Sequence, residues 1–600
     1  MSDAATPDQG CRNLRWALAL FDGLVHGGVR RVVLSPGSRS TPLVMAAQRQ
    51  PLVELTPILD ERSAAFFALG LAQASDRPVA LVCTSGSALA HWFPAVIEAS
   101  ESGIPLILLS ADRPPELRGW GANQTIDQTR LFGGFTREFH DPGPAEEGPA
   151  ALKAMRALGL RAAIVSRGPR PGAVHLNLPF REPLVPGPAC TAEPLGALGA
   201  PDAGSHDRPG ARSSATDRLD VFDTPHWPQD LTPLLGGRGI ICCGPMRPSD
   251  ASAEAIFACA DLLDAPVLAD PLSGLRFRPA QGARITRYDS ALRNRETAVA
   301  LRPDWVVRFG ATPVSKTLSG WIQGIPSILV DTGERWTDPN HDVIARITAD
   351  PMAFCRLLQT RLDRDDSRAA QGAWIRRWAD VEQSLDDLAR AFLEQSPWCE
   401  GHLIADLLER LPEGDGLFCA NSLPIRQLDT WSGQSEKPLR VFGHRGASGI
   451  DGQSSTLAGL NADRSEPTRG VTGLLGDLSF IHDLGGLLLM EKLDRPCIVL
   501  NNGGGRIFDL LPQRGLEGFE PLWRTPPRVQ PDALARAFGL AHRSVEDAAG
   551  FAQAWAEAMD AETRGEPAGL IEVRLDAEQS LATHRAFWNG VRELSIIESE

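Results

Sequence analysis

Short apolar runs alternate with longer amphipathic segments along most of this chain. Near the N-terminus, strand-like and helix-like segments follow one another at residues 31–34, 41–48, 53–59, 61–75, 78–83, 88–100 and 105–110. Short apolar strands separated by helices are typical of a parallel sheet that is covered on both faces. The pattern therefore predicts a first α/β domain that extends to about residue 185.

The same alternation restarts twice. Further strand-like runs lie at residues 239–243, 265–268, 305–309 and 327–330, and then at 417–420, 439–442, 471–475, 497–500 and 569–575. We expect three doubly wound α/β domains with parallel sheets, the first and third similar in style. Their expected bounds are residues 1–185, 226–364 and 395–600, with a flexible Gly/Pro/Ala-rich linker at 186–225 and a helical connector at 365–394.

Composition narrows the class of protein. A chain of 600 residues is too long for one core, and 43% hydrophobic with 22% charged residues is typical of a soluble globular protein. The net charge of −15 argues against nucleic acid as a partner. No apolar run approaches the roughly 20 residues of a membrane span, and residues 1–13 lack the apolar core of a secretory signal. The ten cysteines form no C-x-x-C pairs, so we expect reduced, buried thiols in a cytoplasmic protein.

Asp477 and Asn502 are the most informative pair for function. Each comes just after an expected strand, and a helix-like segment at residues 484–493 lies between them. The carboxyl ends of parallel strands meet at one sheet edge, so we expect this carboxylate and carboxamide to lie close together. Their oxygens suit Mg²⁺, and the glycines at 503–505 would let a phosphorylated ligand approach the backbone. Two ordinary strand-end turns would show the same residues.

Several other strand ends carry polar or cationic residues. Ser38 and Arg39 join a strand to a capped helix start, where free amides and a guanidinium attract anions. Other candidates for reading carboxylates or hydroxyls at strand ends are Arg113, Gln124, Ser422, Arg426 and Arg445. We expect His444 to be structural. The alternative at Ser38 and Arg39 is a capped turn with a solvated arginine, and at Arg113 and Gln124 it is an ordinary strand-to-loop exit.

Residues 310–317 nearly match the phosphate-binding loop G-x-x-x-x-G-K-T. Ser315 stands where the second glycine normally lets the backbone curl around phosphate, so a nucleotide-binding loop is a weak alternative. Lys316 is a candidate contact for an anionic substrate.

The motifs at residues 34–43, 60–62, 84–88, 111–117, 445–452, 476–479 and 501–508 together resemble the MenD family of thiamine-diphosphate-dependent enzymes. The string at 445–452 is the most specific of them. Leu478 departs from the glycine of the wider thiamine-diphosphate superfamily but agrees with this subfamily. The similarity extends over all three expected domains.

The resemblance implies a role for each matching residue. Glu61 would bind the cofactor's pyrimidine ring and protonate it at N1′, Ile450 would wedge beneath the cofactor, and Asp477, Asn502 and the Gly504 carbonyl would hold Mg²⁺ or Mn²⁺. The implied cofactor-binding residues are Glu61, Ser448, Gly449, Ile450, Gly476, Asp477, Leu478, Ser479, Asn502, Gly504, Arg506 and Ile507. The implied substrate contacts are Ser38, Arg39, Arg113, Gln124, Lys316, Ser422, Arg426, Arg445, Ile507 and Phe508. The implied catalytic residues are Glu61, Arg39, Arg113, Gln124, Lys316, Ser422, Arg426 and Arg445.

The resemblance also implies the reaction. Family members use thiamine diphosphate to decarboxylate 2-oxoglutarate and add the resulting succinyl-semialdehyde carbanion to isochorismate, in menaquinone or phylloquinone biosynthesis. Their cofactor-binding domains meet across a subunit boundary, so a dimer or a dimer of dimers is expected. The sequence leaves three alternatives open: another thiamine-diphosphate-dependent 2-oxoacid decarboxylase or carboligase similar to acetolactate synthase, a non-catalytic scaffold, and the nucleotide binder.

Overall fold

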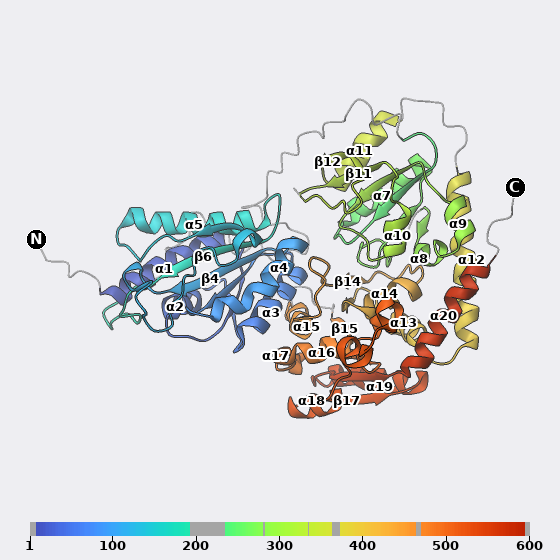
Figure 1. Cartoon of the computed structure of the whole chain (residues 1–600). Coiled ribbons are helices and arrows are strands. Elements are labelled where there is room, and N and C mark those ends of the chain that lie inside the picture. Colours follow the sequence, from blue (N-terminus) through green and yellow to red (C-terminus); the bar gives the residue numbers. More distant parts are fainter. Residues whose placement is uncertain are drawn as a thin grey trace, which may run out of the picture. The chain divides into compact units, whose positions relative to one another are not determined.

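A computed structural model describes residues 8–192, 235–279, 282–333, 335–362, 372–463 and 470–594. Within these ranges the chain forms three six-stranded sheets (Figure 1). All strand pairs within them are parallel, which confirms the three doubly wound domains. Most of the expected linker (residues 193–225) and the start of the expected connector (365–371) lie outside the described residues.

The first sheet has the strand order β2-β1-β3-β4-β6-β5. Its strands are β1 (Arg31–Leu34), β2 (Glu54–Pro57), β3 (Val79–Cys83), β4 (Leu106–Asp112), β5 (Thr136–His140) and β6 (Ala173–Pro179). The apolar pattern did not predict β5, β6 or the two long helices α1 (Gln9–His26) and α5 (Pro149–Arg167). None of the helices in the described ranges is long and apolar enough to cross a membrane.

Helices cover both faces of the first sheet (Figure 1). Val32 packs in one apolar cluster with α1, α2 (Thr41–Arg49) and α5. Val33 faces the other way, into a cluster with α3 (Glu61–Ser75) and α4 (Phe93–Ser102). The helix expected at 88–100 begins instead as a 3-10 turn, η1 (Ala88–Trp92), and α4 starts anew with a proline in its first turn. Proline lacks an N–H and favours a helix start over a helix interior.

The middle sheet has the order β12-β11-β10-β7-β8-β9. Its strands are β7 (Gly239–Cys243), β8 (Val267–Ala269), β9 (Arg284–Ile285), β10 (Trp305–Phe309), β11 (Ser327–Asp331) and β12 (Val343–Thr348). The connecting helices are α7 (Asp250–Leu263), α8 (Tyr288–Ala291), α9 (Arg295–Ala300), α10 (Lys316–Trp321) and α11 (Pro351–Leu362). Numbered from its own first strand, this order is the 3-2-1-4-5-6 of dinucleotide-binding folds.

The third sheet has the order β14-β13-β15-β16-β18-β17. Its strands are β13 (Gly416–Cys419), β14 (Arg440–Phe442), β15 (Val471–Gly476), β16 (Cys497–Asn501), β17 (His542–Val545) and β18 (Leu570–Arg574). The helices in this part of the sequence are α12 (Ala373–Gln395), α13 (Glu400–Arg410), α14 (Leu423–Trp431), α15 (Gln453–Asn461), α16 (Asp477–His482), α17 (Leu484–Leu487), α18 (Pro531–Ala537), α19 (Ala548–Thr563) and α20 (Ala577–Glu593). When the strands are numbered within each sheet, the first and third sheets have the same strand order.

The helix expected at 484–493 is broken. It consists of the short α17 and a separate 3-10 turn, η4 (Met490–Lys492). Gly485 and Gly486 lie in α17, and glycine lowers helix stability because its backbone loses more freedom on folding.

Contacts divide the chain into two compact units. Among the described residues, the first unit contains those up to 192 together with 444–463 and 483–490, and the second contains the remainder. Helix α15 therefore belongs with the N-terminal domain, where it packs against α3. A Cβ atom at Gly70 would collide with the backbone of Thr456, and one at Gly459 would collide with that of Phe67. These two glycines allow the close approach of the two helices.

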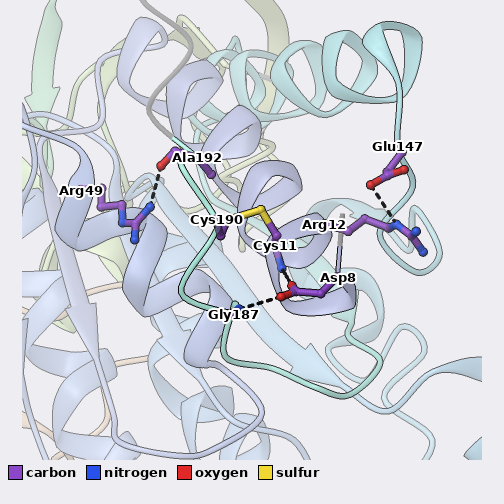
Figure 2. The surroundings of a disulfide bond; sticks show 8 residues. All are labelled: Asp8, Cys11, Arg12, Arg49, Glu147, Gly187, Cys190 and Ala192. Atoms are coloured by element: carbon purple, nitrogen blue, oxygen red, sulfur yellow. Dashed lines mark hydrogen bonds and ion pairs between the residues drawn. A yellow bond between two sulfur atoms is a disulfide. The ribbon is translucent and has the colours of Figure 1, made fainter. Parts of the chain in front are cut away.

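The expectation of reduced cysteines is wrong for one pair. Cys11 and Cys190 form a disulfide with their Cα atoms 5.6 Å apart (Figure 2). The other eight cysteines are free and buried. The bonded residues are 179 positions apart in the sequence, so only the tertiary fold brings them together.

Candidate active site

Asp477 and Gly504 meet at the carboxyl edge of the third sheet. Asp477 begins α16 directly after β15, and Gly504 follows the neighbouring strand β16. The Asp477 carboxylate accepts hydrogen bonds from the Gly504 N–H and from the Leu478 N–H, both at 2.7 Å. The predicted meeting of the two strand ends is therefore confirmed.

The surroundings of Asp477 fit a bound divalent cation. Its side chain is buried, and burial raises its pKa to about 6 although the two backbone donors favour the ionised form. A buried carboxylate of this kind gains from an adjacent cation. In the described ranges no group of three or more His, Cys, Asp and Glu side chains could hold a metal, so a metal here needs amide and carbonyl oxygens too. The half-buried Asn502 and the Gly504 carbonyl are oxygen donors of the kind that Mg²⁺ and Mn²⁺ accept.

The turn after β16 is fixed by its own residues. Gly503 and Gly504 have φ values of 78° and 117°, which glycine adopts without strain. Arg506 donates from Nε to the Asn502 carbonyl at 3.0 Å, and its guanidinium also lies 3.1 Å from Glu578. Arg506, a predicted cofactor contact, thus stabilises the turn that presents Asn502. Of the other residues predicted here, Gly476 ends β15, Leu478 and Ser479 lie in the first turn of α16, and Ile507 and Phe508 are half-buried in η5 (Arg506–Leu510).

The first sheet brings together three of the predicted substrate contacts. Arg113 donates to the hydroxyl of Ser85, and Gln124 donates from Nε2 to the Ser85 carbonyl at 3.0 Å. Burial and the nearby charge of Arg39 lower the pKa of Arg113, which places the two guanidinium groups close together. Ser85 was not among the predicted site residues, although its position two residues after the end of β3 was the available signal.

Arg39 is nearly buried at the start of α2. It donates to the Phe180 carbonyl at 2.9 Å and to the Glu182 carboxylate at 2.8 Å. Ser38 is exposed in the same turn, and its carbonyl accepts from Thr41. Glu182 was not predicted, because it follows the unpredicted strand β6.

Glu61 is the first residue of α3, and the preceding Asp60 caps that helix through the Arg62 N–H at 2.9 Å. Glu61 is half-buried. Burial and the nearby Glu61 raise the pKa of the Cys83 thiol, so the carboxylate lies near the end of β3. Glu61 and Asp477 belong to different compact units, and their expected pairing across a dimer stays a prediction.

Glu98, a buried residue of α4, holds the backbone of residues 445–452, the most specific of the family motifs. Glu98 accepts hydrogen bonds from the N–H groups of Gly446 and Ala447 at 2.8 and 2.7 Å and from the Ser102 hydroxyl at 2.5 Å. It thereby fixes the backbone between two predicted site residues, Arg445 and Ser448. No local pattern around Glu98 predicted this contact.

Contacts with other residues of the first compact unit hold the rest of the segment around residues 444–452. Gln453 donates to the Gly449 carbonyl at 2.8 Å, and Ile450 is half-buried. The ring of His444 stacks on Phe66 with centroids 5.7 Å apart, and burial lowers its pKa. These contacts fit the structural role expected for His444.

Ser422 directly precedes α14, and Arg426 lies in that helix. Ser422 has a φ of 73° just before the helix, and its carbonyl accepts from Arg426 at 2.5 Å. The fully buried Arg276 of the middle domain anchors the same helix through the Asp429 carboxylate at 2.7 Å. The substrate roles of Ser422 and Arg426 stay predictions.

Lys316 is exposed at the start of α10. Amides around it are already occupied: Val314 N–H donates to Asp270 at 2.7 Å, and Leu318 N–H to the Ser315 hydroxyl at 3.0 Å. A phosphate-binding loop needs such amides free, so the geometry disfavours the nucleotide-binding alternative.

Comparison with sequence families gives the class of protein. Residues 15–131 match the family described as the N-terminal TPP binding domain of thiamine pyrophosphate enzymes. Residues 215–419 match the family described as the middle domain of thiamine pyrophosphate enzymes.

Curated relatives narrow the class further. A 2-succinyl-5-enolpyruvyl-6-hydroxy-3-cyclohexene-1-carboxylate synthase of Roseiflexus sp. (strain RS-1) is 40% identical over 97% of this chain and 98% of its own length. Synthases of the same name from Dechloromonas aromatica (strain RCB) and Geobacillus kaustophilus (strain HTA426) are 41% and 40% identical over 89% and 97% of this chain and over 94% and 98% of their own lengths. The chain belongs to this family of synthases, which are transferases.

Proposed function

We propose that this protein decarboxylates 2-oxoglutarate and adds the resulting succinyl-semialdehyde carbanion to isochorismate, giving 2-succinyl-5-enolpyruvyl-6-hydroxy-3-cyclohexene-1-carboxylate. The product would enter menaquinone or phylloquinone biosynthesis. The observation that carries the proposal is the contact between the buried Asp477 carboxylate and the Gly504 N–H, in a chain whose full-length relatives bear this synthase name.

The proposed cofactors are thiamine diphosphate and Mg²⁺ or Mn²⁺. Bound thiamine diphosphate supplies a nucleophilic carbon and an electron sink. Asp477, Asn502 and the Gly504 carbonyl hold the metal and with it the diphosphate. Glu61 holds a proton at N1′ of the pyrimidine ring, and Ile450 packs beneath the cofactor.

Cationic side chains receive the substrates, both of which carry carboxylates. Arg39 and Arg113 are suited to this task because guanidinium groups bind carboxylates bidentately, and Gln124 is held beside them through Ser85. Lys316, Ser422, Arg426 and Arg445 are the further proposed contacts.

We assign residues 1–185 to the pyrimidine-binding domain and 395–600 to the diphosphate-binding domain. The active protein is proposed to be at least a cytoplasmic dimer, in which Glu61 of one subunit serves Asp477 of its neighbour.

The direct test is to incubate purified protein with isochorismate, 2-oxoglutarate, Mg²⁺ and thiamine diphosphate, and to identify the product by mass. Carbon dioxide release from 2-oxoglutarate but not from pyruvate separates this reaction from that of an acetolactate-type synthase. Release from pyruvate alone would reject the proposal.

Glu61→Gln tests the proton assignment. We expect the variant to bind thiamine diphosphate normally and to lose about 100-fold or more in turnover, because glutamine cannot protonate N1′. Calorimetry of cofactor binding and steady-state kinetics measure the two effects. Unchanged turnover would remove Glu61 from the mechanism.

A further inference from the structure

We propose that Glu182 is an internal carboxylate that occupies Arg39 in the absence of substrate, and that a carboxylate substrate must displace it to bind there. The proposal deepens the function proposed above, because it makes Glu182 a determinant of which ligands can reach Arg39.

Arg39 does not need Glu182 to stay in place. Its guanidinium donates to the Phe180 carbonyl at 2.9 Å, and its side chain is only 7% exposed. The Glu182 side chain is 71% exposed and meets Arg39 through one oxygen at 2.8 Å. Arg39 is thus fixed by its surroundings, whereas Glu182 can swing away into solvent.

The backbone on both sides of Glu182 is held firmly. The buried Asn13 donates from Nδ2 to the carbonyls of Arg181 and Pro183, at 2.8 and 3.3 Å. Arg181 forms a two-pronged ion pair with Glu116, at 2.6 and 3.0 Å. The carboxylate is therefore delivered to Arg39 from a fixed point, and only its side chain has to move.

Residues 181–192, called the strap from here on, are fastened along their length. Cys190 is bonded to Cys11 near the start of α1, and the Gly187 N–H donates to the Asp8 carboxylate at 2.7 Å (Figure 2). Arg49 at the end of α2 donates to the Ala192 carbonyl at 2.5 Å. These anchors keep the strap, and Glu182 with it, against the N-terminal domain.

The charges at the site favour exchange of one carboxylate for another. Burial and the nearby charge of Arg39 lower the pKa of Arg113, whereas the carboxylates of Asp112 and Glu182 raise it. Glu182 therefore lies near both guanidinium groups. Ion pairs of exposed carboxylates contribute little, because water and salt screen them. A substrate carboxylate that binds a buried guanidinium with both oxygens gains more.

The need to displace Glu182 from Arg39 also disfavours the binding of uncharged molecules. A neutral molecule offers Arg39 no replacement for the charge of Glu182, so it cannot displace the internal carboxylate at low cost. Glu182 therefore lowers affinity for the correct substrate modestly and lowers affinity for uncharged molecules more.

Glu182→Gln is the test, in the protein loaded with Mg²⁺ and thiamine diphosphate. We expect a roughly 3- to 10-fold lower KM for one of the two substrates, with kcat changed less than about 2-fold. The substitution removes the exposed carboxylate that competes for Arg39 and alters no proposed catalytic residue. Calorimetry with succinate, a plain dicarboxylate, should show tighter binding by a similar factor. Unchanged or raised KM values for both substrates would overturn the proposal.

Two controls sharpen the result. Glu116→Gln breaks the neighbouring ion pair on the strap without touching Arg39, and we expect unchanged KM values. In an Arg39→Ala background, Glu182→Gln should no longer alter succinate binding; a persisting effect would contradict competition at Arg39. If the wild type forms no product from isochorismate and 2-oxoglutarate, the proposed function fails. The succinate titrations still decide the role of Glu182.

Discussion

The first and third sheets share one strand order but carry opposite chemistry at their carboxyl edges. Ser85 lies two residues after the third strand of the first sheet, and Asp477 directly follows the third strand of the third sheet. After the fourth strand, the corresponding residues are Arg113 and Asn502. One edge thus gathers guanidinium groups around a hydroxyl, and the other gathers oxygen donors around a carboxylate. The same topology therefore places an anion-binding edge in one domain and a cation-binding edge in the other.

The connections after the second strands differ in another way. Helix α3 follows β2 and begins with Glu61, whereas α15 follows β14 and the segment containing Ile450. Although α15 comes after a strand of the third sheet, it packs in the N-terminal unit against α3, its topological counterpart. Two predicted cofactor-binding elements from distant parts of the sequence thereby share one unit.

The largest expected effect comes from substituting alanine for Asp477 and, in a second variant, for Ser85. Asp477→Ala should weaken Mg²⁺-dependent thiamine diphosphate binding by about 100-fold or more, because it removes the only charged group of the proposed metal site. Ser85→Ala should leave cofactor affinity unchanged and raise the KM of a carboxylate substrate, since Ser85 holds Arg113 and Gln124. Calorimetry and steady-state kinetics measure both.

Equal loss of cofactor affinity in the two variants would break the comparison between the two edges. Normal affinity in Asp477→Ala would remove the metal assignment. Thermal unfolding of both variants checks that each remains folded.

The apolar pattern located most strands whose side chains are buried on both faces, although it missed the fully buried β6. β1, β3, β7, β10 and β16 lie where it placed them. Edge strands were harder: β5, β12 and β17 were not predicted, and many of their residues are half-buried or exposed. An edge strand has one solvated side and lacks the continuous apolar run that marks a central strand.

The site residues also divide into those that the sequence predicted and those that it did not. Asp477 and Arg113 were predictable because each directly follows a strand, and Arg39 because it lies in the loop that joins β1 to α2. A parallel sheet brings such strand ends together. Glu98 and Glu182 were not, because they act on residues 348 and 143 positions away in the sequence. Only the tertiary fold reveals such contacts.

Glu98→Gln tests whether that long-range contact positions the segment before α15. Glutamine has one acceptor oxygen where two backbone N–H groups need acceptors, so one N–H would face an amide donor. We expect turnover to fall by about 10-fold and amide hydrogen exchange of Gly446 and Ala447 to accelerate, because a positioning contact is lost. The exposed Glu146→Gln is the matched control and should change neither quantity. Loss of activity with unchanged exchange would contradict a positioning role.

The smallest effect concerns the sixth strands of the two sheets, where His175 and Glu572 occupy the same register position and are both buried. Burial lowers the pKa of His175 to about 3. Burial alone would raise the pKa of Glu572, but hydrogen bonds from His542, Asn501 and Arg574 lower it to about 2.

Both groups make folding less favourable in acid, in different pH windows. Below its ordinary pKa of about 6.5, His175 takes up a proton only in the unfolded chain, so its stabilising contribution is lost as the pH falls from about 6.5 toward 3. The contribution of Glu572 is present above its ordinary pKa of about 4.5 and is lost as the pH falls from there toward 2.

The difference between the two strands can be measured with His175→Gln and Glu572→Gln, by urea unfolding at pH 7 and pH 5.5. Between these values the wild type should lose about 1 kcal/mol relative to His175→Gln, because glutamine binds no proton in either state. Its stability relative to Glu572→Gln should stay constant, because Glu572 remains ionised in both states over this range. A constant difference for His175→Gln would show that the buried imidazole is not kept neutral, and that charge at the two equivalent positions does not follow from their different partners.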